Sequence, residues 1–323
     1  MNEERNTSQR PIGMRLFLSP DEPRLRAGWR LLLHSIGFGI ALSVLTLLAV
    51  MFIYGQGGTF SYGLPIDATI ELLAVLITTY AARRLLDRRS FVSLGFFLDK
   101  HTLSDLVVGF TIPGFLMGAV FLTEWALGWI TIEGFAWAST PVESWLGTLL
   151  QGLLFFVLVG VSEELLSRGY HLQNLASGLN VTWGVLLSSS AFALLHLANP
   201  DSSLFSTFGI FAAGLFLAYG WVRTRQLWLS IGLHIGWNLF EGTIFGFPVS
   251  GYTFGALIQQ NSSGPGMITG GRFGPEAGLI VLPAMLLGAL LIRYYTRNRS
   301  SNPFDSSSET GKNEPHLRSA STL

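Results

Sequence analysis

Long apolar runs dominate the chain, and short stretches that hold most of its charged residues separate them. A helix that crosses a bilayer needs about 20 consecutive apolar residues. Eight runs reach or approach that length, and each is predicted to form a transmembrane helix. The predicted spans are Trp29–Tyr54, Ala68–Leu86, Ser104–Ile130, Trp145–Leu175, Val181–Ala198, Leu204–Val222, Leu227–Phe247 and Ala277–Tyr295. The pattern predicts an all-α fold, a polytopic membrane bundle of about eight helices.

The polar segments divide the chain into parts. The short, mixed segment Phe91–Leu103 is expected to lie along the membrane interface as an amphipathic helix. The residues after the last span are rich in Ser, Asn and charge, which predicts disorder. The predicted parts are a polar N-terminal segment (1–28), N-terminal helices with the interfacial segment (29–103), a core (104–247), an external loop with the last span (248–295) and a disordered tail (296–323).

Composition supports the membrane interpretation and excludes several classes of site. Only 12% of the residues are charged and the mean hydropathy is +0.45, whereas a soluble domain carries about twice that charge. The chain has no cysteine, which excludes disulfides, thiol nucleophiles and Cys-ligated zinc. Its net charge is zero, so nothing indicates a nucleic-acid partner. The predicted partner is the lipid bilayer, and the oligomeric state stays unknown.

Basic residues predict the orientation of the spans. An even number of spans puts both termini on one side of the membrane. Of the 20 Lys and Arg residues, only Arg272 falls on the opposite side. Lys and Arg concentrate in cytoplasmic loops. The sequence therefore predicts a multi-pass protein of the plasma (inner) membrane with both termini cytoplasmic.

Three polar clusters interrupt the apolar runs. A charged side chain at membrane depth costs at least ~2.5–3.5 kcal/mol, and more when it has no partner. Several such residues in neighbouring spans are therefore expected to meet around one polar site. The clusters are Glu163-Glu164-x3-Arg168, Phe192-x3-His196 and His234-x3-Asn238.

Helical spacing separates the two glutamates. Residues four apart share a face of a helix, so Glu164 and Arg168 are expected to pair, while Glu163 is turned by about 100°. Under a plainer interpretation, both carboxylates balance Arg168. A lone histidine in a membrane is often only an interhelical hydrogen-bonding residue. The presence of two histidines, His196 and His234, beside two glutamates favours a functional site.

The chemistry that these residue types support is the activation of water. A carboxylate acts as general base, a neutral histidine binds a divalent metal such as zinc or orients a water, and Asn238 with a second histidine can donate to an oxyanion. The expected reaction is hydrolysis of an acyl bond, most plausibly a peptide bond. The sequence contains no His-Glu-x2-His motif and no Gly-x-Ser-x-Gly motif. A bound metal would therefore take His196 and His234 as ligands from separate helices.

The clusters resemble the three motifs of the CPBP intramembrane proteases. This family is also called the CAAX protease and bacteriocin-processing, or Abi, family, and it includes the CAAX prenyl endopeptidases of the Ras-converting type. Ser167 departs from the Phe that commonly precedes this Arg, at a position expected to serve packing. The similarity covers about residues 104–247, and the matching segments are Glu163-Glu164-Leu165-Leu166-Ser167-Arg168-Gly169, Phe192-Ala193-Leu194-Leu195-His196 and His234-Ile235-Gly236-Trp237-Asn238.

The resemblance implies an intramembrane endopeptidase. In the family, the first glutamate and the histidine of the second motif activate water, which points to Glu163 and His196. The histidine and asparagine of the third motif, His234 and Asn238, stabilise the oxyanion. Both a zinc-dependent and a glutamate mechanism stay open. The implied substrates are membrane-associated or lipidated proteins or peptides, prenylated or not.

Two other classes of function stay open. The chain could be a non-catalytic immunity or scaffold protein of the same fold, although its motifs are intact. It could be a small-solute transporter whose buried carboxylates relay protons. The lack of an internal repeat argues against a transporter built from inverted halves.

Overall fold

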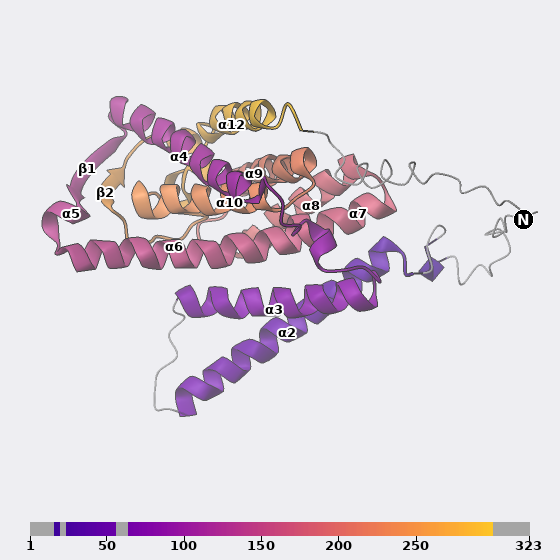
Figure 1. Ribbon diagram of the computed structural model, residues 1–323. Coiled ribbons are helices and arrows are strands. Elements are labelled where there is room, and N and C mark those ends of the chain that lie inside the picture. The colour runs from indigo at the N-terminus through magenta and orange to yellow at the C-terminus, as the bar shows by residue number, and fades with distance from the viewer. Residues whose placement is uncertain (1–15, 20–23, 56–63, 300–323) are drawn as a thin grey trace, which may run out of the picture.

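The computed structural model describes residues 16–19, 24–55 and 64–299, which form a helical bundle (Figure 1). Two further π-helices continue α6 and α10, and one antiparallel strand pair links two loops. The helices are α2 (Ala27–Gly55), α3 (Leu64–Leu85), α4 (Thr102–Ala126), α5 (Ala136–Ser139), α6 (Val142–Glu164), α7 (Leu172–Gly178), α8 (Val181–Leu195), α9 (Leu204–Thr224), α10 (Trp228–Asn238), α11 (Gly266–Thr269) and α12 (Val281–Tyr295). The strands are β1 (Ile130–Phe135) and β2 (Ile258–Ser262), the 3-10 turns are η2 (Val92–Leu94), η4 (His196–Ala198), η6 (Gly271–Phe273) and η7 (Pro275–Ala277), and the π-helices are η3 (Leu165–His171) and η5 (Leu239–Ile244).

The predicted helical membrane bundle is confirmed. Six helical segments of the described residues are long and apolar enough to cross a membrane. α12 is a shorter apolar helix, and α10 continues directly into η5. A helix therefore stands at each predicted span. The six are Ala27–Gly55, Pro65–Leu85, Thr102–Ala126, Val142–Gly178, Val181–Ala198 and Leu204–Thr224.

The third predicted span is too long at its end. α4 ends at Ala126, Gly128 follows with φ 72°, and Ile130 opens strand β1. Gly adopts this left-handed conformation without strain, and the β-branched residues after it favour a strand. β1 pairs antiparallel with β2 and contains a bulge between Ile132 and Gly134. This pair, which the prediction of an all-helical fold did not include, ties the loop after α10 to the loop after α4.

The predicted interfacial helix over Phe91–Leu103 is wrong. Only the 3-10 turn η2 forms there, and α4 begins at Thr102. Gly95 ends the turn with φ 111°, and its carbonyl accepts a hydrogen bond from Leu227 N at 2.9 Å. The segment therefore packs against the start of α10 instead of lying as a separate helix on the membrane.

The first four residues of the predicted disordered tail, 296–299, are ordered. Thr296 is fully buried and accepts a hydrogen bond from Arg223 Nε through its hydroxyl at 2.9 Å. Arg299 forms an ion pair with Asp105 of α4 at 2.7 Å. These contacts fix the first residues after α12. Residues 300–323, and most of the predicted polar N-terminal segment, lie outside the described residues.

The short helix α10 is the centre of the bundle. Every residue from Leu229 to Asn238 is buried. α10 and α4 approach backbone to backbone: a Cβ on Gly109 would lie 2.5 Å from Leu229 O, and one on Gly232 would lie 2.5 Å from Leu106 O. Only glycine permits this distance. The two predicted site residues that α10 carries are therefore held in the interior.

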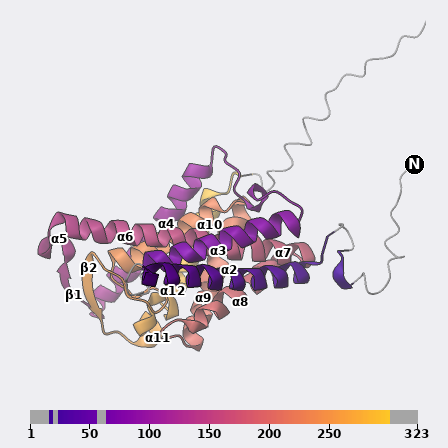
Figure 2. The same cartoon turned by 90° about the horizontal axis from the view of Figure 1, so that it is seen from below.

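The helices lie on two sides of α6. Figure 1 shows α2 and α3 together along one side of α6, with α4, α9, α10 and α12 on the other. Figure 2, seen from below, looks onto α2 and α3 and again shows the β1–β2 pair and α7 at opposite ends of the bundle. The first turns of α2 and the last turn of α3 lie at the α7 end, since Arg30 and Asp87 contact each other and Arg30 reaches Ser177 of α7 at 3.0 Å.

Candidate active site

Two of the three helices that carry predicted site residues, α6 and α10, change from α to π geometry at the site. η3 begins directly after Glu164, and η5 begins directly after Asn238. π-helical turns are rare and occur mostly at functional sites. The same irregularity therefore marks α6 and α10 at the level where their polar side chains lie.

Glu164 is fully buried and has two partners. Its Oε1 accepts a hydrogen bond from Arg168 Nη1 at 2.7 Å, so the predicted pair is present. The same oxygen accepts from His234 Nδ1 at 2.8 Å. Both bonds involve a charged acceptor, which makes them stronger than neutral hydrogen bonds. Glu164 therefore joins α6 to α10 and fixes the orientation of the His234 ring.

Arg168 connects the same glutamate to α8 and α9. Its guanidinium, on a side chain that is 1% exposed, donates through Nη2 to the carbonyl of Gly214 at 3.0 Å. It also lies over the ring of Phe192, 4.5 Å from the centroid, a favourable cation–π geometry. Arg168 thus links α6, α8 and α9 on the side of the site away from the cavity.

Glu163 faces the other way. Its side chain is 21% exposed, and its Oε2 lies 3.6 Å from His234 Nε2 and 3.9 Å from His196 Nε2. The two glutamates therefore differ as the helical spacing predicts. Both distances exceed a direct hydrogen bond, and polar groups at such distances are commonly bridged by a water. The three atoms can bind one water molecule between them.

The hydrogen bonds of the two histidines determine which ring nitrogen is free. His196 lies at the end of α8, and its Nδ1 is 2.8 Å from the carbonyl oxygen of Phe192. A carbonyl only accepts, so Nδ1 carries the hydrogen. His234 Nδ1 likewise donates to Glu164. In their neutral forms, both rings therefore present an Nε2 lone pair on the side of Glu163.

A cavity of about 640 Å³ adjoins these groups. Of the six predicted catalytic residues, four line it, while Glu164 and Arg168 lie behind its wall. The four are Glu163, His196, His234 and Asn238, and Asn238 is 6% exposed. Most of the remaining wall is apolar and includes Phe38, Leu42, Ile70, Phe155, Phe156, Phe192, Phe216 and Trp237. The cavity can hold an apolar chain beside a small polar centre.

Three carboxylates of the cavity were missed by the sequence analysis: Asp67 and Glu71 of α3 and Glu276 of η7. Glu71 lies within the second predicted span, so the cost of a charge at membrane depth could have selected it. Glu276 gave no such signal, because it lies in the predicted external loop. Its Oε2 accepts hydrogen bonds from Ser250 N at 3.0 Å and from Ser250 Oγ at 2.6 Å. Burial raises the pKa of Glu276, and the Ser250 bonds oppose that shift.

The side chains of the site include donor atoms of the kinds that bind metal ions. The described residues contain no group of three or more His, Cys, Asp or Glu side chains positioned to hold a metal ion. Two imidazoles with one carboxylate are nevertheless a donor set that zinc accepts. The Nε2 atoms of His196 and His234 and the Oε2 atom of Glu163 are donor atoms of these types on one wall of the cavity.

Comparison with known proteins gave one family. Residues 145–240 match the sequence model described as type II CAAX prenyl endopeptidase Rce1-like. The matched region includes α6, η3, α7, α8, α9 and α10 and therefore all six predicted catalytic residues. A search of curated proteins and a search of solved structures each returned no match.

Proposed function

We propose that this integral membrane protein hydrolyses peptide bonds with a water activated by Glu163 and His196, because residues 145–240 match the model of the Rce1-like type II CAAX prenyl endopeptidases. This match supports a protease that acts on protein or peptide substrates at the membrane. The convergence of Glu163, His196 and His234 on one cavity wall carries the residue assignment.

Glu163 is the general base of this proposal. Its carboxylate takes a proton from the water, and the oxygen of that water attacks the carbonyl carbon of the scissile bond. His196 accepts the second hydrogen of the same water through Nε2, because its own hydrogen on Nδ1 is bound to Phe192 O. The water is thereby oriented before the attack. Glu163 is suited to this task because Arg168 is already neutralised by Glu164.

Asn238 and His234 are the oxyanion donors. The side-chain amide of Asn238 lines the cavity one helical turn after His234 and can donate to the carbonyl oxygen as it becomes negative. His234 can donate from Nε2 when its ring is protonated, which the carboxylate of Glu164 at Nδ1 accommodates. When the intermediate collapses, the C–N bond breaks and Glu163 returns its proton to the leaving amine. The products are a carboxylate and an amine.

A divalent metal would bind at the same place. His196 and His234 would be its ligands together with Glu163, and the ion would supply Lewis acidity to the water and to the carbonyl. The roles of Glu164, Arg168 and Asn238 do not change, since none of them contributes to the proposed donor set.

The cavity wall indicates the substrate class. Aromatic and aliphatic side chains from α2, α3, α6, α8 and α9 form most of it. A peptide that is membrane-associated or lipidated fits such a wall better than a hydrophilic peptide, because burying its apolar atoms contributes about 25 cal/mol per Å². Prenylated and unprenylated forms of one peptide would test whether the lipid contributes.

A cleavage assay on the full chain in liposomes tests the proposal. We expect turnover of a fluorogenic membrane-anchored peptide by the wild type and none by Glu163→Gln. Loss of turnover with a chelator, restored by zinc, would identify the metal route; unchanged turnover would identify the glutamate route. Equal turnover by the wild type and Glu163→Gln would reject the assignment. Solute flux without any cleavage would favour a transporter, and the absence of both would favour a scaffold or immunity protein.

A further inference from the structure

The cavity beside Glu163 is acidic. Four carboxylates line it, those of Asp67, Glu71, Glu163 and Glu276, and its described lining residues include no lysine and no arginine. Its two histidines carry a positive charge only when they are protonated. The proposed hydrolysis uses Glu163 and leaves the other three acids without a role. The charge of those three acids is therefore available to a ligand.

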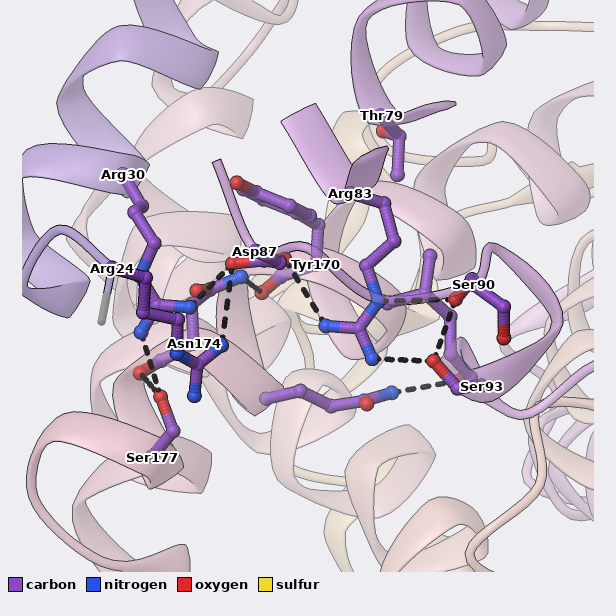
Figure 3. A network of polar contacts seen from close by, with 12 residues as sticks. Arg24, Arg30, Thr79, Arg83, Asp87, Ser90, Ser93, Tyr170, Asn174 and Ser177 are labelled. Atoms are coloured by element: carbon purple, nitrogen blue, oxygen red, sulfur yellow. Dashed lines mark hydrogen bonds and ion pairs between the residues drawn. The ribbon is translucent and has the colours of Figure 1, made fainter. Parts of the chain in front are cut away.

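Two buried carboxylates elsewhere in the bundle show how such a charge is balanced. Asp87 is 1% exposed, and Figure 3 shows Arg30 and Arg83 converging on it, with Arg83 Nη1 at 3.0 Å. Glu164 is paired with Arg168 at 2.7 Å. Buried charges are costly unless they are paired in this way. The described part of the cavity wall offers its acids no such guanidinium, so a cationic group of a ligand would supply the counter-charge.

Glu276 is firmly held at the cavity wall. The residue is 4% exposed, and its Oε2 accepts the hydrogen bonds from N and Oγ of Ser250. Ser250 has φ 49°, a left-handed conformation that is uncommon for a residue other than glycine. Its carbonyl accepts a hydrogen bond from Asn199 Nδ2 at 3.0 Å, and Asn199 directly follows η4, which begins at His196. The carboxylate is therefore pre-organised relative to the helix end that carries His196.

Glu276 also lies near the groups that are proposed to activate water. Burial raises the pKa of Glu276, and the bonds from Ser250 oppose the rise. Positive charge on His196 and His234 opposes it as well, so the carboxylate lies near both rings. Hydrogen bonds to a carboxylate favour its ionised form. A cation bound at Glu276 would therefore adjoin the peptide bond that Glu163 hydrolyses in the proposed reaction.

The rest of the cavity wall suits the stem of a basic side chain. The rings of Phe155, Phe156 and Phe216 are among its lining residues. Lysine and arginine bury their methylene groups along apolar surface and keep the charged end in a polar place. Glu163 Oε2, which solvent does not reach, has no hydrogen-bond partner among the described residues. An apolar wall with such acceptor oxygens matches a ligand that has an apolar stem and a donor at its end.

We propose that the cavity selects substrates with a lysine or arginine next to the scissile bond, and that Glu276 determines this preference. The inference rests on the proposed hydrolysis and adds to it a class of substrate. A basic side chain at membrane depth is costly when it has no partner, and a carboxylate offsets that cost with a charge-assisted hydrogen bond. An acidic side chain at the same position is repelled.

Cleavage by the full chain in liposomes tests the preference. The substrates are membrane-anchored fluorogenic peptides that differ in one residue next to the scissile bond, which is Lys, Leu or Glu. The variable residue stands on the amino side of the bond in one set and on the carboxyl side in another. In one set, the wild type should cleave the Lys peptide with a kcat/KM about ten- to a hundredfold above that of the Leu peptide, the range for one charge-assisted hydrogen bond. The Glu peptide should be cleaved most slowly.

Glu276→Gln should remove the preference, because it keeps the size of the side chain and loses the charge. Its kcat/KM for the Lys peptide should fall to that for the Leu peptide, which should change little. Glu133→Gln, an exposed acid on β1, is the matched control and should keep the preference. Equal cleavage of the Lys and Leu peptides by the wild type overturns the proposal without any variant. Retention of the preference in Glu276→Gln, or its loss in Glu71→Gln alone, overturns the assignment to Glu276.

Binding separates this proposal from the proposed hydrolysis. The affinity of the same peptides is measured in detergent on Glu163→Gln, which is expected to bind without cleaving, and on Glu163→Gln/Glu276→Gln. Tighter binding of the Lys peptide, lost in the double variant, supports the cation site even if the wild type cleaves no peptide. Cleavage of all three peptides at equal rates leaves the hydrolysis intact and rejects the cation site.

Discussion

His234 donates through Nδ1 to Glu164 at 2.8 Å, with its other ring nitrogen on the side of Glu163. This single bond explains why two adjacent glutamates of α6 differ. Glu164 orients the imidazole from the buried side, as carboxylates commonly do for functional histidines. Glu163 meets the opposite edge of the same ring at 3.6 Å, inside the cavity.

Glu163→Gln should abolish cleavage without unfolding the protein. The substitution keeps the size of the side chain and removes the proton acceptor, and loss of a general base lowers the rate about 10²–10⁴-fold. The measurement is single-turnover cleavage in liposomes, with a melting curve for each variant. Glu143→Gln, an exposed acid in the first turn of the same helix, is the control and should keep full activity.

Glu164→Ala should destabilise the protein more than Arg168→Ala does. Removing one partner of a buried ion pair costs about 3–5 kcal/mol. Without Glu164, both the guanidinium and the His234 ring lose their acceptor. Without Arg168, Glu164 keeps the His234 bond. The check is chemical unfolding of both variants, with the exposed Arg293→Ala as control.

The double variant Glu164→Ala/Arg168→Ala should be more stable than Glu164→Ala alone, because no unpaired guanidinium stays buried. A thermodynamic cycle measures this coupling. Strictly additive losses would contradict an energetic pairing of Glu164 with Arg168.

Asn238→Ala should lower kcat about 10²–10³-fold while leaving KM nearly unchanged, because an oxyanion donor acts mainly in the transition state. Steady-state kinetics on a membrane-anchored peptide would measure both constants. Asn261→Ala, on the exposed strand β2, is the matched control. A raised KM with an unchanged kcat would instead assign Asn238 to binding of the substrate in its ground state.

The sequence predicted which central residues of the site meet, but it did not predict all the residues that line the cavity. Glu163, Glu164, His196 and His234 stand out because a buried polar group in an apolar run requires partners, and the structure brings them together. The same argument could have selected Glu71, which also lies in an apolar run, but Glu71 belongs to none of the three motifs. Glu276 could not be found this way, because folding of the loop carries a polar-segment residue to the cavity wall.

The predictions for the β1–β2 region and for the segment Phe91–Leu103 were wrong for a related reason. Hydropathy shows which residues avoid water but not which loops pair with each other. β1 and β2 are more than a hundred residues apart in the sequence. Their pairing depends on where α4 ends before β1 and where η5 ends before β2. Likewise, Gly95 accepts a hydrogen bond from Leu227 at the start of α10, a contact that no local pattern predicts.

Glu276→Gln should make stability less dependent on pH. Burial raises the pKa of Glu276 above its ordinary value of 4.5. A carboxyl whose folded-state pKa is raised stabilises the fold fully below that ordinary value, and this contribution is lost as the pH rises through the raised value. From pH 4.5 upward, the wild type should therefore lose more stability than Glu276→Gln. Melting curves across that range measure it, with the exposed Glu133→Gln as control; parallel curves for all three proteins would contradict the prediction.

Labelling of single cysteines should place the β1–β2 end outside the cell and the arginine-rich end inside. The chain contains no cysteine, so each introduced thiol gives one signal. Ser262→Cys on β2 and Ser90→Cys after α3 are both exposed positions. An impermeant thiol reagent applied to intact cells should label Ser262→Cys and should label Ser90→Cys only after lysis, because Arg83, Arg84, Arg88 and Arg89 precede Ser90 and basic loops stay cytoplasmic. A cytoplasmic reporter fused after Leu323 should agree with Ser90→Cys. Labelling of both cysteines from outside, or the reverse pattern, would reject the orientation.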